Sequence, residues 1–384
     1  MSKLDIIKAA LFTPGSNGWG LPLVIWGDPG IGKTFQIRQL AEKYDMDIEE
    51  LTPGARGEGA FGVIPVPNGE CLTYPMPDWA LRITNKAAIL FIDEGTTAPP
   101  AVQPALLGLV QFKTIGSSTL GSRVRPIMAA NPPEIAAAGY EFPPTVSNRM
   151  GHLNWTRPDI GQWTEYLTQS LSNNTDKISA ELEEQRVMAQ WSNVFSRAVG
   201  EYSGFLYRMP EFLHKMPKRE DPQISRAWPS PRTNELAVRA LAGAYVHGLS
   251  ESDKDEFIGA FVGDACSIEF SAWRKNADLP LPEELLTGKE TFKHDAKRLD
   301  KTVAIMSSCV VHLSNTELKD RNNKAIKLWE IMLDVCEARA PDLVVSAARS
   351  LCRTASKLPD PRKFEAGKSV LKRLGSLLTL SGEI

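Results

Sequence analysis

The chain has 384 residues, of which 42% are hydrophobic and 23% are charged, so it can form a sizeable core and is not globally disordered. At roughly 100–200 residues per domain, this length predicts two or three domains. The net charge is −2, whereas proteins that coat nucleic acid typically carry a surplus of basic residues. A nucleic-acid partner is therefore not expected.

The five cysteines are odd in number and form no CxxC pair, which argues against a disulfide framework and a zinc site. A reducing, cytoplasmic compartment fits this usage. No secretory signal is evident at the N-terminus, and no apolar run approaches the roughly 20 residues needed to cross a bilayer. We therefore expect a soluble cytoplasmic protein without a membrane partner.

The first element that the sequence predicts is a buried strand at residues 21–26, where an apolar run ends in turn residues. The turn is followed by apolar residues at helical spacing, from Phe35 to Tyr44. The loop between them fits the phosphate-binding pattern G-x-x-x-x-G-K-[ST]. Its residues are Gly27, Asp28, Pro29, Gly30, Ile31, Gly32, Lys33 and Thr34.

Each part of this loop has a predicted role toward ATP. Glycines let backbone N–H groups turn toward the phosphates, and the following helix adds its positive N-terminal end. Lys33 would contact the β- and γ-phosphates, and the Thr34 hydroxyl would bind Mg²⁺. A chance match is the alternative, at about one chain in a hundred of this length, and the flanking strand and helix make it rarer.

Residues 53–79 are rich in glycine and proline, and Asn68-Gly69 separates two apolar segments. This pattern predicts a β-hairpin inserted at about residues 60–79. Phe61, Val63 and Trp79 near it could form a contact surface, or could equally pack on the core.

A second buried strand is predicted at residues 87–92, and it ends in two acidic residues about 60 positions after Lys33. Asp93 would hold Mg²⁺, and Glu94 would orient and deprotonate the attacking water. Strands often end in a solvated acidic turn, so the assignment depends on the phosphate loop occurring at this separation.

A helix is expected from Pro99 to Leu109 and a third buried strand from Val124 to Ala130. Asn131, which ends this strand, could orient the water near the γ-phosphate. Strands that alternate with helices predict a parallel sheet with ligands at the carboxyl ends of its strands. After Arg157 the chain is predicted to be mainly helical.

Two lone arginines are further candidates for the site. Arg149 lies in a loop, and Arg232 lies in Pro229–Thr233 at the expected start of a helix. A lone arginine is usually a solvated surface residue. As an arginine finger, Arg149 would complete a neighbouring subunit's site and neutralise charge in the transition state.

These motifs, in this order, resemble those of the AAA+ superfamily and, more narrowly, of the MoxR-like ATPases in the helix-2-insert clade. The resemblance covers about residues 20–250. Where the family usually has Asp and Phe around the finger arginine, this chain has Asn148 and Met150; Arg157, Arg123 and Arg125 are fallback candidates. The segments that carry the resemblance are Asp93-Glu94 with Ala98–Pro100, Gln103 and Ala105–Leu107; Ala129–Pro132; Glu141–Arg149; Ser230–Arg232; and the insert Gly59–Trp79.

The resemblance implies an α/β fold: a P-loop parallel-sheet domain at residues 1–156, an α-helical lid with the sensor-2 residue Arg232 at 157–290, and a C-terminal helical extension at 291–384. It implies a homo-oligomeric, usually hexameric, ring with ATP between subunits. It also implies chaperone-like remodelling of a protein partner, such as one bearing a von Willebrand factor A domain. These expectations are analogies to the family.

Three functions remain open at this point. The first is an ATPase that remodels a partner protein, and the second is a nucleic-acid-associated motor or loader. The third is an ATP-gated oligomeric scaffold or switch in which slow hydrolysis only resets assembly. Salt-sensitive DNA binding that stimulates ATPase would favour the second, and very low turnover would favour the third.

Overall fold

The computed structural model describes residues 3–56, 58–62, 64–132, 135, 139–170, 177–315, 317–353 and 358–379. The chain forms two compact units. The first contains Met1–Ala189 and His214–Ser267, and the second contains Gln190–Leu213 and Ile268–Ile384. This division into two units does not test the lid boundaries expected at residues 157 and 291, which stay predictions.

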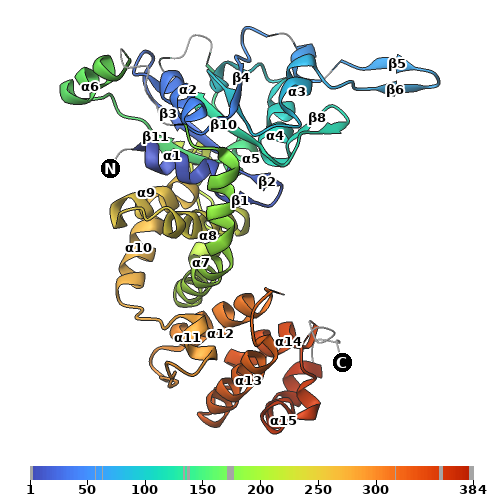
Figure 1. Ribbon diagram of the computed structural model, residues 1–384, viewed down its shortest axis with the longest axis vertical. Coiled ribbons are helices and arrows are strands. Elements are labelled where there is room, and N and C mark those ends of the chain that lie inside the picture. Colours follow the sequence, from blue (N-terminus) through green and yellow to red (C-terminus); the bar gives the residue numbers. More distant parts are fainter. Residues whose placement is uncertain are drawn as a thin grey trace. The chain divides into compact units, whose positions relative to one another are not determined.

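A five-stranded sheet lies at the centre of the first unit (Figure 1). All its pairings are parallel. Apart from Arg125 of β10, the inner strands consist of apolar residues, because both of their faces are buried. The expected parallel α/β sheet is therefore confirmed. The strands, in their order across the sheet, are β11 (Gly151–Asn154), β3 (Leu23–Trp26), β10 (Val124–Ala130), β7 (Ala88–Ile92) and β4 (Asp47–Leu51).

The register of this sheet brings the strand ends together. Trp26 of β3 lies opposite Ala130 of β10, and Ile92 of β7 lies opposite Met128 of β10. Leu51 of β4 lies opposite Ile92, and its carbonyl accepts a 2.8 Å hydrogen bond from the Asp93 N–H. The loops that follow β3, β10, β7 and β4 therefore leave the sheet at one edge.

Helices cover the sheet in the first unit: α2 packs on β4 and β7, α3 on β4, α4 on β10 and α9 on β11. The helix expected at Pro99–Leu109 is shifted, because α4 begins at Gln103 and ends at Phe112. Pro104, rather than Pro99, occupies the first turn, where a missing N–H costs little. The helices are α1 (Lys3–Leu11), α2 (Lys33–Lys43), α3 (Asp78–Ile83), α4, α5 (Pro144–Ser147), α6 (Ile160–Ser170), α8 (Pro231–Val246) and α9 (Glu251–Val262).

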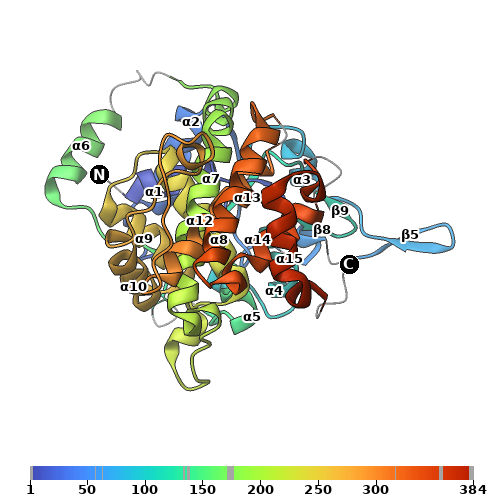
Figure 2. The ribbon, with the colours of Figure 1, turned by 90° about the horizontal axis from the view of Figure 1, so that it is seen from below.

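The expected hairpin forms from β5 (Val66–Asn68) and β6 (Cys71–Thr73), and projects from the sheet domain as an arm (Figures 1 and 2). Asn68 pairs with Cys71, which leaves Gly69 and Glu70 as the turn, and Gly69 has the positive φ of 62° that such a turn favours. Two shorter antiparallel pairs join β1 (Pro14–Gly15) to β2 (Gly18–Trp19) and β8 (Thr114–Ile115) to β9 (Ser118–Thr119).

Two of the apolar residues near the hairpin belong to the core rather than to a contact surface. Phe61 and Trp79 are each only 1% exposed, and the Trp79 indole N–H donates a 2.7 Å hydrogen bond to the Ala60 carbonyl. Val63 lies outside the described residues. On the arm itself, Ile64, Val66, Leu72 and Tyr74 are exposed.

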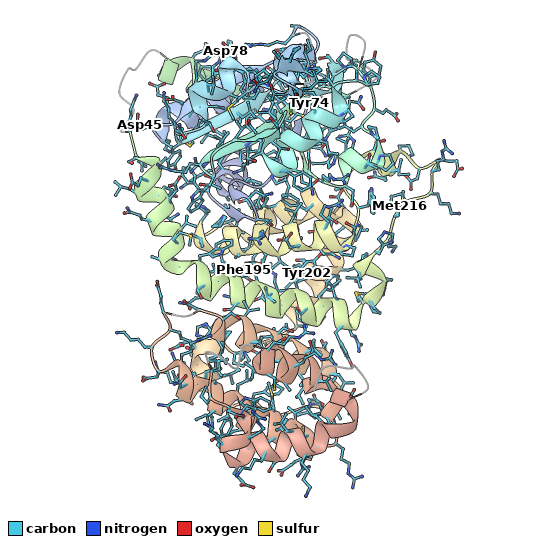
Figure 3. The ribbon with its side chains drawn as sticks, turned by 90° about the vertical axis from the view of Figure 1, so that its right-hand side faces the viewer. Asp45, Tyr74, Asp78, Phe195, Tyr202 and Met216 are labelled. Carbon is cyan, nitrogen blue, oxygen red and sulfur yellow. The ribbon has the colours of Figure 1, made fainter. Side chains whose placement is uncertain are left out.

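The second unit is helical, as expected, and α7 (Ala180–Arg208) and α10 (Asp264–Lys275) each extend into it from the first. Tyr202 on α7 (Figure 3) packs 5.0 Å from Phe270 and 5.7 Å from Phe205, measured between ring centroids. Asp300 accepts hydrogen bonds from Trp273 and Arg298. The remaining helices are α11 (Pro282–Leu286), α12 (Leu299–Leu313), α13 (Arg321–Glu337), α14 (Val345–Arg353) and α15 (Glu365–Thr379).

Among the described helices, none is both long and apolar enough to cross a membrane.

We expect Trp79→Phe to lower the free energy of unfolding by about 1–3 kcal/mol, because it leaves the partly buried Ala60 carbonyl without its donor and removes part of a buried ring. Urea unfolding measures the effect. Trp163→Phe on α6 is the matched control, since Trp163 is 53% exposed and its replacement should change stability by less than about 0.5 kcal/mol. Equal effects of the two substitutions would contradict the anchoring role of Trp79.

Candidate functional site

The phosphate-binding loop connects β3 to α2, and two of its glycines adopt a backbone conformation that other residues rarely take. Gly30 and Gly32 have φ values of 78° and 89°, a left-handed backbone that glycine adopts without penalty. The described part of the chain supplies no hydrogen-bond acceptor to the backbone N–H groups of Gly30, Ile31, Gly32 and Lys33. Unpaired N–H groups at the start of a helix are a site for an anion such as a phosphate.

Lys33 is the first residue of α2, and its side chain reaches back to the start of the loop. Its ammonium donates hydrogen bonds of 2.7 Å to the Gly27 carbonyl, 2.9 Å to the Asp28 carbonyl and 2.9 Å to Asn131 Oδ1. Burial lowers the pKa of Lys33, and the negative charges of Asp93, Asp28 and Glu94 oppose that shift. These bonds use the three donors of the ammonium and hold it beside the loop.

Thr34 and Asp93 meet across the site, although they are 59 positions apart in sequence. The Thr34 hydroxyl donates a 2.7 Å hydrogen bond to Asp93 Oδ2, and Asp93 Oδ1 accepts a 2.9 Å bond from the Glu94 N–H. A hydroxyl and a carboxylate oxygen side by side are hard oxygen ligands, which suit Mg²⁺. Mg²⁺ typically takes only one or two protein ligands besides phosphates and water, so this pair fits it.

Glu94 is exposed and has an unusual backbone. Its φ and ψ of 55° and 43° are left-handed, a conformation that costs a non-glycine residue roughly 1–2 kcal/mol. The next residue, Gly95, lies so close to Met128 that an added Cβ would be 2.3 Å from its sulfur. No described group hydrogen bonds to the Glu94 carboxylate, which leaves its oxygens available to a water molecule.

Asn131 follows β10, between the strands that carry the other groups. Its side-chain oxygen accepts the bond from Lys33, and its carbonyl accepts a 3.3 Å hydrogen bond from the Thr96 hydroxyl. The structure therefore brings together Lys33, Thr34, Asp93 and Asn131 by direct contacts, with Glu94 adjoining them in sequence.

Neither arginine candidate joins this cluster within the described chain. Arg149 donates to the Thr145 carbonyl, and its buried Nε atom has no described partner. Burial lowers the pKa of Arg149, and the positive charge of Arg232 lowers it further. Arg232 is exposed in the first turn of α8, which confirms its predicted place at a helix start.

Asn148, where the sequence departs from the family pattern, connects the two arginine-bearing segments. Its amide donates a 3.1 Å hydrogen bond to the Trp228 carbonyl, and its oxygen accepts a 2.8 Å bond from the Ser230 hydroxyl. Ser230 is the N-cap of α8 and forms a capping box with Thr233. An ionised aspartate could not donate to the Trp228 carbonyl, so asparagine suits this contact.

Of the fallback arginines, two have structural partners. Arg125 is fully buried, and both Arg125 and Arg123 form ion pairs with Glu184 on α7. Arg123 is partly exposed. Arg157 is exposed.

A contact network next to the phosphate loop was not predicted from the sequence. The Trp26 indole donates a 3.0 Å hydrogen bond to His152, and the Arg226 guanidinium lies 3.8 Å over the Trp26 ring. Burial lowers the pKa of His152 to about 4, so the ring is neutral and donates from Nε2 to the Ser147 carbonyl. The position of Trp26 just before the loop was the only local signal, because its partners are distant in sequence.

Comparisons with known proteins identify no family. No family model matches the chain, and no curated protein matches it. Among solved structures, it is similar to a "putative ATPase" from Cytophaga hutchinsonii ATCC 33406, at 17% sequence identity and a TM-score of 0.44, over 67% of this chain and 78% of that one. A likeness this distant carries no functional argument.

We expect Asn148→Asp to lower the free energy of unfolding by about 1–3 kcal/mol at pH 7, because a buried carboxylate would face the Trp228 carbonyl without a proton to donate. Burial should raise the pKa of the new carboxyl above its unfolded value, so the folded state binds the proton more tightly. The loss should therefore be largest above that pKa and should shrink as the pH falls.

Urea unfolding at pH 7 and pH 5 tests this expectation. Asn17→Asp is the matched control, because the Asn17 amide also donates to a backbone carbonyl, that of Gln111, but is exposed to water. A loss in Asn148→Asp that is the same at both pH values, or no larger than the control's, would contradict the proposed role of the amide.

Proposed function

We propose that this chain is an ATPase that binds Mg·ATP on the loop Gly27–Thr34 and hydrolyses it with Glu94. The observation that carries the proposal is the convergence of three strand ends. Lys33, Asn131, Thr34 and Asp93 are linked by direct hydrogen bonds, beside backbone N–H groups that have no described acceptor.

In this proposal the loop N–H groups and the helix α2 N-terminus hold the phosphates of ATP. Lys33 exchanges its bonds to the loop carbonyls for bonds to the β- and γ-phosphates, where its positive charge offsets theirs. Thr34 and Asp93 hold Mg²⁺, which would neutralise charge on the phosphates. Asn131 lies beside Lys33 and would orient the water at the γ-phosphate.

Glu94 is the general base of the proposed reaction. Its carboxylate takes a proton from the water, whose oxygen bonds to the γ-phosphorus, while the bond from that phosphorus to the bridging oxygen of ADP breaks. The left-handed backbone of Glu94 fixes where its side chain leaves the loop. Strain of this kind is often found at catalytic residues.

Substitution of Glu94 and Lys33 tests the assignment. Glu94→Gln should reduce kcat for ATP hydrolysis by about 100-fold or more while ATP still binds, because the amide cannot accept the proton. Lys33→Ala should weaken ATP binding by about tenfold or more, because a charged contact is lost. Glu42→Gln and Lys43→Ala, exposed at the far end of α2, are matched controls and should leave both quantities unchanged. Normal turnover in Glu94→Gln would overturn the role of Glu94.

We further propose that the ATPase works as a ring and acts on a protein partner, of the kind that bears a von Willebrand factor A domain. Arg149 of one subunit would contact the γ-phosphate bound by a neighbour, and Arg232 would act as the sensor-2 residue that senses the γ-phosphate. Asn148 links the two segments that carry these arginines through its hydrogen bonds to Trp228 and Ser230. The motifs of residues 20–250, which resemble those of the MoxR-like ATPases, support a ring with a protein partner.

The mass of Glu94→Gln in solution, measured with and without Mg·ATP, tests the ring. A shift to about six subunits with Mg·ATP is expected, because ATP would bridge neighbouring subunits. Adding Arg149→Ala should abolish the shift, whereas adding Arg157→Ala should not. A monomer under both conditions would contradict a finger supplied by a neighbour.

A further inference from the structure

Thr97 makes a hydrogen-bonded link between the Glu94 turn and a segment that follows a different strand. The turn is η2 (Gly95–Thr97), and the Thr97 hydroxyl donates a 2.8 Å hydrogen bond to the Glu94 carbonyl. The same hydroxyl accepts a 3.1 Å bond from the Gly54 N–H. A threonine hydroxyl has one donor and can accept at the same time, so both bonds form together.

On the Glu94 side, the hydroxyl supports a backbone conformation that is unfavourable by itself. The Glu94 carbonyl accepts 2.8 Å bonds from both the hydroxyl and the N–H of Thr97, which close the turn over residues 94–97. The left-handed φ of Glu94 persists only where surrounding contacts hold it. Loss of one of these bonds should therefore let the Glu94 side chain leave its position.

On the Gly54 side, the contact is close enough to require glycine. A Cβ added at Gly54 would lie 2.8 Å from the Thr97 hydroxyl oxygen and 3.0 Å from its Cβ. Gly54 belongs to a tight turn after β4, in which the Ala55 and Arg56 N–H groups both bond to the Thr52 carbonyl. That segment runs on toward the hairpin arm of β5 and β6, so movement there would reach Thr97.

We propose that Thr97 is a positioning residue for Glu94: its hydroxyl fixes the orientation of the general base and makes it depend on the position of residues 52–56. This inference rests on the proposed ATPase function. Thr97 acts through Glu94 and contacts no substrate itself. Its effect should therefore appear in the rate of hydrolysis rather than in ATP affinity.

The test compares steady-state ATP hydrolysis by the wild type, Thr97→Val, Thr97→Ser and Thr84→Val. Thr97→Val keeps the branched shape without the hydroxyl and should lower kcat by about tenfold with KM unchanged, which matches a partly misplaced base. Thr97→Ser keeps the hydroxyl and should restore the wild-type kcat. Thr84→Val is the matched control, because the Thr84 hydroxyl also accepts a bond from a glycine N–H, that of Gly121 at 3.0 Å.

The Gly54–Thr97 bond is exposed to water, so removing it should cost little stability. If Thr97→Val nevertheless fails to fold, Gly54→Ala applies the same test, since its Cβ would push Thr97 out of place; kcat should fall and KM should stay unchanged. Wild-type kcat in Thr97→Val, equal losses in Thr97→Ser, or equal losses in Thr84→Val would overturn the inference. Absence of ATP hydrolysis by the wild type would instead overturn the proposed function.

Discussion

The parallel register of β3, β10 and β7 determines where the polar groups of the site lie. Trp26 and Ala130 lie opposite each other, as do Ile92 and Met128, so the residues that follow these strands emerge at one edge of the sheet. The side chains of these strands, apolar except for Arg125 of β10, are buried on both faces, so the strands cannot shift without exposing the core. The contacts of Lys33 with Asn131 and of Thr34 with Asp93 follow from this alignment.

The loops at this edge are tied to one another as well as to the sheet. Asp93 bonds to the carbonyl of Leu51, Thr97 joins Gly54 to Glu94, and Thr96 bonds to Asn131. Each bond connects a group at the site to the end of a neighbouring strand or to the segment that follows it. Hydrogen bonds therefore join the turn that carries the base, the segment that begins with Asn131 and the segment before the hairpin arm.

Much of the fold and of the central site could be predicted from the sequence, because these features depend on local patterns. The three apolar runs that precede Gly27, Asp93 and Asn131 predicted the inner strands, and Asn68-Gly69 predicted the hairpin. The edge strand β4 escaped prediction because Asp47, Glu49 and Glu50 make it polar, and Pro99 suggested too early a start for α4.

Contacts between distant segments could not be predicted, since no local pattern marks them. The bonds of Asn148 to Trp228 and Ser230, and of Thr97 to Gly54, join segments that only the folded chain brings together. Likewise, Phe61 and Trp79 are large apolar residues that could form a contact surface or pack in the core. Their burial depends on how the chain packs around them.

The most direct test of the account is amide hydrogen exchange of Glu94→Gln with and without Mg·ATP. We predict that ATP protects the amides of Gly30 to Thr34, because phosphate oxygens would become the acceptors that the described chain does not supply to Gly30–Lys33. The double variant with Lys33→Ala should lose this protection at the same ATP concentration. Binding of ATP without protection of these amides would contradict the assignment of the nucleotide to this loop.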